Sequence, residues 1–193
     1  MPIKSTYSIP TLPTCAGFVL PTVDNAVCIT DNVTELSRIV KIYLVEPSAT
    51  NNLVAAAAPT AMTAAAWSAV ILQTGAGKIR VLSGVGALPK PTSVKQEVNG
   101  ESYEISKDFK LSFAHNNIST ANYEMMRLVQ QATFFMWFQT DGGYIYGGLT
   151  GIRCKVEESD YELTNGKDSI GAINFSLEWR RANYPERILS PIA

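Results

Sequence analysis

The sequence predicts a mainly β fold, a β-sandwich or barrel of about eight to ten strands with one or two helices packed on it. Short stretches rich in β-branched and aromatic residues recur along the chain, and turn residues separate them at the spacing typical of all-β folds. Only two segments show a helical pattern. With 193 residues, the chain is long enough for one well-buried core and short for two.

We therefore expect one domain with two extensions. Residues 1–25 contain four prolines among small apolar residues, which excludes a regular helix and leaves few donors for a strand ladder. They are predicted to form an extended N-terminal arm. The single β-sandwich domain is expected to span residues 26–181, and residues 182–193 are expected to form an extended C-terminal tail.

The first strands of the domain are predicted from alternation. In residues 37–47, the apolar residues Val40, Ile42 and Leu44 alternate with Lys41, and Pro47 ends the strand. Two further short strands are expected at residues 26–29 and 78–83. The glycines and prolines of residues 84–91 predict a loop that interrupts regular structure several times.

A helical insertion is predicted at about residues 59–73. Pro59 can precede or open the helix, alanine dominates it, and Trp67, Val70 and Ile71 give it one apolar face. No charged residue occurs between Glu46 and Lys78, but a membrane span is not favoured, because alanine, threonine and serine insert poorly compared with leucine. A buried or interfacial helix fits this composition better.

A polar hairpin arm is predicted at residues 93–106. Asn99-Gly100 is the strongest short signal for a hairpin turn, and the flanking strands read as polar on both faces. A two-stranded ribbon with few large apolar residues is marginal in water, so we expect this arm to be ordered only against a neighbour. The expected assembly interface consists of Val94, Gln96, Val98, Asn99, Gly100, Tyr103 and Ile105.

A second helix is predicted at residues 121–132. Ser119 or Thr120 can cap it, and Glu124 is expected in its positive first turn. The residues that share its predicted apolar face are Ala121, Met125, Leu128 and Ala132. Strands are expected on both sides of this helix, at residues 107–115, 133–140, 144–151, 152–163 and 169–181, with turns at Asp141–Gly143 and Asn165-Gly166.

The strand at residues 133–140 is apolar on both faces, which predicts a central strand covered on both sides. By the period of two, Phe135 and Trp137 should share one face. The other face should carry Phe134, Met136 and Phe138. Cover is expected from Met125, Leu128 and Ala132 of the helix on one side, and from Phe175 and Leu177 of a second sheet on the other.

No catalytic signature is present. His115 is the only histidine, so every histidine-dependent scheme would need it, and a polar residue in a strand-to-helix loop is the simpler interpretation. Gly75, Gly77 and Lys78 do not complete a phosphate-binding loop. Cys15, Cys28 and Cys154 show no metal-binding or disulfide spacing, which indicates reduced structural thiols. We expect no enzyme activity, no metal and no cofactor.

Two further groups of residues have both a simple and a chemical interpretation. Glu157, Glu158, Asp160 and Glu162 could form a paired-carboxylate or calcium site, but the calcium-loop pattern is absent, and a solvated edge or a charged contact between subunits fits better. Tyr144 and Tyr146 could stack sugars or bases, although cross-strand packing is commoner. The turn at Asp141–Gly143 needs no bound anion.

The charge pattern points to assembly. Charged residues make up 17% of the chain, below the roughly 25% usual for soluble domains, and interface cores are depleted of charge. The formal net charge of -1 and pI of about 5.9 argue against tight binding of phosphate backbones. The segment after Met1 has no apolar region of a secretory signal, so we expect the protein to be made and kept in the cytoplasm.

The chain resembles the tail tube and tube-like ring proteins of tailed bacteriophages in its layout. The likeness covers roughly residues 107–180, and the stretch "NYEMMRLVQQATFFMWFQTDGGYIYGGLTGI" is similar to structural proteins of phages that infect Bacteroidetes. No invariant motif carries it. The resemblance implies a non-enzymatic β-sandwich that forms rings by strand pairing between neighbours, and rings that stack into a conduit for DNA. The long alanine-rich insertion departs from a minimal tube subunit.

From this resemblance we expect a virion protein of the tail or head-tail region, assembled in the host bacterial cytoplasm. Its partners would be copies of itself, in rings that are hexameric or higher, and other tail or connector proteins. DNA would be transiting cargo, and no membrane would be involved. Two alternatives remain open: a capsid decoration or minor head protein, and a non-viral sugar- or peptide-binding module that uses Tyr144, Tyr146 and Trp137.

Overall fold

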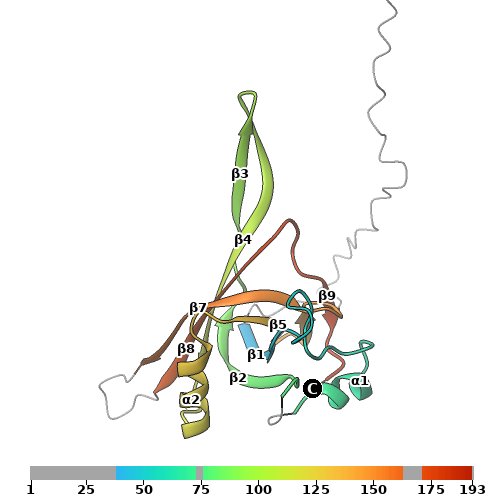
Figure 1. Cartoon of the computed structure of the whole chain (residues 1–193), viewed down its shortest axis with the longest axis vertical. Coiled ribbons are helices and arrows are strands. Elements are labelled where there is room, and N and C mark those ends of the chain that lie inside the picture. The colour runs from blue at the N-terminus through green and yellow to red at the C-terminus, as the bar shows by residue number, and fades with distance from the viewer. Residues whose placement is uncertain (1–37, 73–75, 163–170, 193) are drawn as a thin grey trace, which may run out of the picture. The chain divides into compact units, whose positions relative to one another are not determined.

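A computed structural model describes residues 38–72, 76–162 and 171–192, and these residues fold around a closed β-barrel (Figure 1). Some predictions lie outside the described residues: the strand at residues 26–29, the turn at Asn165-Gly166, and the roles of Cys15 and Cys28. The fold is mainly β with two helices in the described residues, as the sequence predicts.

Six antiparallel strands form the barrel wall. In order around the wall they are β1 (Arg38–Val45), β2 (Arg80–Ala87), β4 (Glu101–His115), β8 (Ala172–Arg181), β7 (Ile152–Glu162) and β5 (Thr133–Thr140). Pairing of β1 with β5, in which Ile42 lies opposite Phe138, closes the barrel. Closure removes the exposed sheet edges that an open sheet would present.

Three short strands and two helices lie outside the wall. They are β3 (Thr92–Val98), which pairs with β4; β6 (Tyr144–Tyr146), which pairs with β5; β9 (Arg187–Leu189), which pairs with β6; α1 (Ala64–Val70); and α2 (Thr120–Val129). The C-terminal segment, which was predicted to be an extended tail, therefore contributes a strand through its pairing with β6.

The barrel interior is one apolar cluster to which every wall strand contributes side chains. It includes Ile42, Phe113, Met136, Val156 and Leu177. One end of the cluster contains a stack of Phe109 on Trp179, with ring centroids 5.1 Å apart. Met126 and Val129 of α2 also belong to this cluster. Helix α2 therefore packs on the same core that the barrel encloses.

Strand β5 is central, as predicted, and its two faces belong to two different clusters. Met136 and Phe138 lie in the barrel interior with Phe134 packed against them, whereas Phe135 and Trp137 lie in a second cluster outside the wall. The predicted division of the strand into two faces is confirmed. Because β5 is bonded to β1 on one edge and to β7 and β6 on the other, its edges are also covered.

The predicted cover for these two faces was wrong in one respect. Phe175, Leu177 and α2 all lie on the barrel-interior side, while the outer face of β5 is covered by α1 and the segment around it. Trp67 of α1 makes edge-to-face contacts with Tyr43 and Trp137, with ring centroids 5.3 and 5.6 Å apart. The alanine-rich insertion is therefore the second layer over β1 and β5.

Three other predicted elements differ in detail. Helix α1 starts only after its N-cap Thr63 and is shorter than the predicted residues 59–73. In α2, Ser119 is the N-cap as expected, but the first turn holds no acidic residue, so Glu124 lies beyond it, and Leu128 is 78% exposed while Met126 and Val129 are buried. The apolar face of α2 is thus rotated from the predicted one.

The first half of the predicted loop at residues 84–91 is instead strand, since β2 continues to Ala87. Its glycines allow a close crossing of β4. A Cβ at Gly84 would lie 2.1 Å from the carbonyl oxygen of Ala114, and one at Gly86 would lie 2.9 Å from that of Ser112. Glycine here therefore permits the close approach of two paired strands, β2 and β4, and does not mark a turn.

Among the described residues, no helix is long and apolar enough to cross a membrane.

Candidate assembly surface

The predicted hairpin exists and extends beyond the barrel body (Figure 1). We call it the arm, and it consists of β3, the turn Asn99-Gly100 and residues 101–106 of β4. Asn99 and Gly100 have φ of 54° and 82°, the left-handed conformation that a two-residue hairpin turn requires. The rest of β4, Lys107–His115, pairs with β8 in the wall. One strand of 15 residues thus serves both barrel and arm.

The arm has two faces of different character. Residues directly opposite in an antiparallel pair share a face, so the register of β3 with β4 places Val98 beside Glu101, Gln96 beside Tyr103 and Val94 beside Ser106. These six residues form what we call the outer face. It is continuous with the exterior of the barrel, because Thr92 on the same face pairs with Asp108, which pairs with Arg180 outside the wall.

The inner face of the arm is the hydrophilic one. It carries Ser93, Lys95, Glu97 and Glu104, and Lys107, the first wall residue of β4, continues it at the base. The hydroxyl of Ser93 donates to Glu104, and Lys107 Nζ lies 3.2 Å from the same carboxylate, so these contacts agree with the register. They hold the pKa of Glu104 below its usual range, with the Ser93 hydrogen bond the larger cause.

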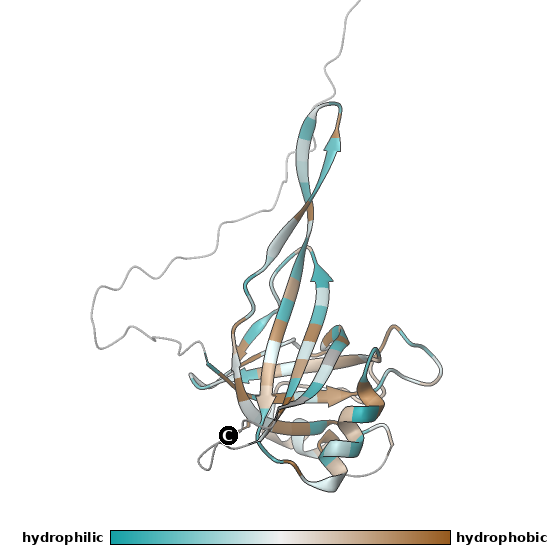
Figure 2. Ribbon diagram, turned by 90° about the vertical axis from the view of Figure 1, so that its left-hand side faces the viewer, coloured by the Kyte–Doolittle hydropathy of each residue, from teal (hydrophilic) through white to brown (hydrophobic). Residues whose placement is uncertain are grey.

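The outer face leaves apolar side chains open to solvent. Val98 is 47% exposed and Tyr103 is 51% exposed, and Tyr103 donates to Glu101 on the same face. Ile105, at a bulge in the register between Val94 and Lys95, is 52% exposed. In Figure 2 the arm is mostly hydrophilic with a few apolar positions, while hydrophobic and hydrophilic residues alternate along the wall strands.

The predicted interface residues are therefore largely brought together. Val94, Gln96, Val98 and Tyr103 share the outer face, Asn99 and Gly100 form the tip, and Ile105 lies at the bulge. The prediction that the arm is polar on both faces was wrong. The pairs next to the turn, Val98 with Glu101 and Gln96 with Tyr103, follow from the two-residue turn and the period of two, and the bulge changes only the pairing beyond them.

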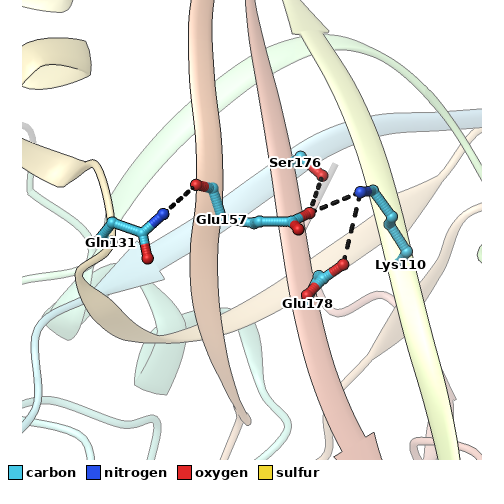
Figure 3. A network of polar contacts seen from close by, with 5 residues as sticks. All are labelled: Lys110, Gln131, Glu157, Ser176 and Glu178. Atoms are coloured by element: carbon cyan, nitrogen blue, oxygen red, sulfur yellow. Dashed lines mark hydrogen bonds and ion pairs between the residues drawn. The ribbon is translucent and has the colours of Figure 1, made fainter.

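Ion pairs mark the base of the arm and the wall below it. Arg180 donates to Asp108 from two nitrogens of its guanidinium group, Nε to Oδ1 at 2.5 Å and Nη2 to Oδ2 at 2.9 Å, which lowers the pKa of Asp108. Further down the same exterior face, Lys110 Nζ lies 2.6 Å from Glu157 and 3.5 Å from Glu178 (Figure 3). The Lys110 hydrogen bond is the main cause of the lowered pKa of Glu157.

The acidic cluster at residues 157–162 does not form a metal site in the described residues. Glu157 lies at a bulge in β7 and faces Lys110, whereas Ser159 is buried and its hydroxyl donates to the carbonyl of Met126 in α2. Within the described part of the chain, no group of three or more histidine, cysteine, aspartate or glutamate side chains could hold a metal ion.

His115 is the last residue of β4 and is almost fully buried. Its Nδ1 lies 2.6 Å from the carbonyl oxygen of Ser83, which must accept, so Nδ1 carries the proton and Nε2 accepts from the amide of Asn122 at 2.9 Å. This side chain ties β4 to β2 and α2. It lines a cavity of about 990 Å³ together with Ser119 and Asn122, but both ring nitrogens are already hydrogen-bonded.

The remaining candidate residues are packing residues. Tyr146 stacks on Phe138 with ring centroids 4.7 Å apart, Trp137 is buried and its Nε1 donates to the carbonyl of Gly148, and Arg187 lies over the ring of Tyr144. Cys154 is buried, and burial raises the pKa of its thiol to about 12, which makes it unreactive.

Comparison with models of protein families, with curated protein sequences and with solved structures finds no match for this chain.

Proposed function

We propose that this protein is a non-enzymatic structural subunit of a tailed-phage virion, a ring-forming tail tube or head-to-tail conduit protein through which DNA passes. The observation that carries the proposal is the arm. It grows out of a wall strand, extends away from the core, and carries Val98, Tyr103 and Ile105 half exposed. An isolated two-stranded ribbon is only marginally stable in water, so a projecting one of this kind indicates contact with another molecule.

Closed architecture supports the same proposal. Every strand of the barrel wall is paired on both edges, so the wall offers no edge for strand pairing between copies, and the projecting arm can direct association. The low charge content fits an assembled subunit, and a net charge of -1 fits a conduit that lets DNA move without holding its phosphates.

The test is assembly of the purified full chain, followed by electron microscopy and size-exclusion chromatography with light scattering. We expect rings or tubes. In the armless variant, residues 94–105 are replaced by Asn-Gly; it should keep the circular dichroism spectrum of the β fold and remain monomeric. A wild-type chain that stays monomeric at high concentration and is missing from purified particles would refute the proposal.

Hydrogen exchange gives a second readout in the same preparations. Backbone amides of the arm should exchange quickly in the monomer and slowly in the assembled form, while those of β5 should be protected in both. Equal protection of the arm in both states would contradict a role in assembly. Antibody labelling of particles would then place the protein in tail or head, which separates the conduit from a capsid decoration.

A further inference from the structure

The surface over β1 and β5 is unusual because it has no charge. We call residues 47–72 and 76–77, which include α1, the cap. The sequence has no charged residue between Glu46 and Lys78, yet much of the cap faces solvent. Its exposed apolar side chains include Leu53 at 67%, Val54 at 48% and Leu72 at 50%. Alanine, threonine, serine and asparagine make up most of the remainder.

The charges that border the cap are turned toward its own backbone. Glu46 accepts from the amide of Gly77 at 2.5 Å, and Arg80 donates to the carbonyl of Leu72 at 2.7 Å. Lys78 donates to the carbonyl of Ala69 at 3.4 Å. These contacts tie down the ends of the segment. They also leave its outward surface without a charge of its own, which is the composition of an interface core.

The cap and the outer face of the arm are matched in character and lie on opposite sides of the barrel. Around the wall, β4 and β8 are separated from β1 and β5 by one strand in each direction. The arm continues from β4, and the cap covers β1 and β5. Figure 1 accordingly shows the arm and α1 at opposite ends of the barrel. The arm of one copy therefore cannot reach its own cap.

We infer that the cap of one copy receives the outer face of the arm of the next copy. This inference rests on the proposed function and names the second surface that the assembly needs. The cap carries no charge, and the outer face carries one, the carboxylate of Glu101, which accepts a hydrogen bond from Tyr103, so contact between the two surfaces desolvates little charge. Such a head-to-tail contact is heterologous, and repetition of it generates closed rings or open helical filaments.

The size of the arm limits the strength of a single contact. A ribbon of two strands with seven residues in β3 is about 23 Å long and about 10 Å wide. Its outer face is well below the roughly 800 Å² per partner of a standard interface. A single pair is therefore weak, and stability comes from closure, in which every copy uses both its arm and its cap.

The experiment places one negative charge on each surface of the full chain. Val98→Asp on the arm, and Leu53→Asp or Ala65→Asp on the cap, change exposed residues and should leave the melting temperature within a few degrees of wild type. Each should reduce assembly at a fixed concentration by at least tenfold. Leu128→Asp is the matched control, since Leu128 is an exposed leucine of α2 outside both surfaces.

Mixing the variants tests the head-to-tail geometry. Val98→Asp has an intact cap and Leu53→Asp has an intact arm, so their mixture should give dimers containing one of each after treatment with an amine-reactive crosslinker, and no larger species. Each variant alone should stay monomeric under the same treatment.

Assembly of the two cap variants at wild-type level, with Val98→Asp still monomeric, would overturn this inference and leave the proposed function standing. So would a mixture that gives crosslinked species larger than dimers. If wild type and the Leu128→Asp control also fail to assemble, the proposed function falls and the inference falls with it.

Discussion

Strand β5 and strand β3 of the arm, with eight and seven residues, are alike in length but opposite in environment. In β5 the six residues Phe135–Thr140 are buried, both edges are paired, and two clusters cover the two faces. In the arm no residue of β3 is buried. The stability of β5 is therefore a property of the subunit, whereas that of the arm depends on what it touches. Substitutions should separate the two.

The largest effect is expected at Trp137. Its ring is fully buried against Trp67, so Trp137→Ala should lower the free energy of unfolding by about 3–5 kcal/mol. Met136→Ala, on the opposite face of the strand, should also destabilise, by about 2–5 kcal/mol. Chemical denaturation measures both. An unchanged midpoint for Trp137→Ala with a lowered one for Met136→Ala would indicate that the outer face of β5 is a ligand platform instead of a second core.

An intermediate effect is expected at the seam between β2 and β4. In Gly84→Ala the new methyl group would meet the backbone carbonyl of Ala114 at 2.1 Å, and the strands would have to separate. We expect a loss of about 1–3 kcal/mol from overpacking. The neighbouring Ser83→Ala, which trims an exposed side chain of the same strand, should change stability by less than about 0.5 kcal/mol. Similar midpoints for the two variants would show that the seam opens without cost.

The smallest effect is expected at Asp108, where the arm joins the wall. Its pKa is lowered from 3.8, first by the Arg180 hydrogen bond. A carboxyl whose folded pKa is depressed stabilises the fold above its unfolded pKa, and the contribution is lost as pH falls through the folded value. The melting temperatures of wild type and Asp108→Asn should thus differ slightly at neutral pH and converge below pH 3.8. The difference should be small because the ion pair is exposed and screened by solvent. A difference that stays constant across this pH range would show that it does not come from the charge of Asp108.

Much of the barrel could be predicted from local sequence, while its closure could not. The two faces of β5 follow from the period of two, and the hairpin follows from Asn99-Gly100. Pairing of β1 with β5 joins segments about 95 residues apart, and no local pattern encodes it. Strand β2 was missed at its C-terminal half because glycine usually marks a turn, while here it marks the close passage of Ala114.

The candidate surface was also predicted in part. The arm residues were found by their position beside a turn, and the period of two already places Val98 and Tyr103 on one face, whereas the bulge at Ile105, which pairs Val94 with Ser106, has no local signal in the sequence. Helix α2 offers two overlapping apolar stripes, one through Met125 and Leu128 and one through Met126 and Val129. Contacts with β7, such as the hydroxyl of Ser159 on the carbonyl of Met126, select the second stripe, and these contacts are long-range.

The continuity of β4 has a mechanical consequence. A pull on the arm is directed along the same backbone that runs from Lys107 to His115 beside β8. The hydrogen bonds between antiparallel strands are perpendicular to the strands, so the load falls on the whole row of bonds in shear and does not open them one after another. An assembly joined through this arm would transmit tension from one subunit to the next along β4, the direction in which the barrel resists force best. Such an assembly would break first at the contact between copies and not within the barrel.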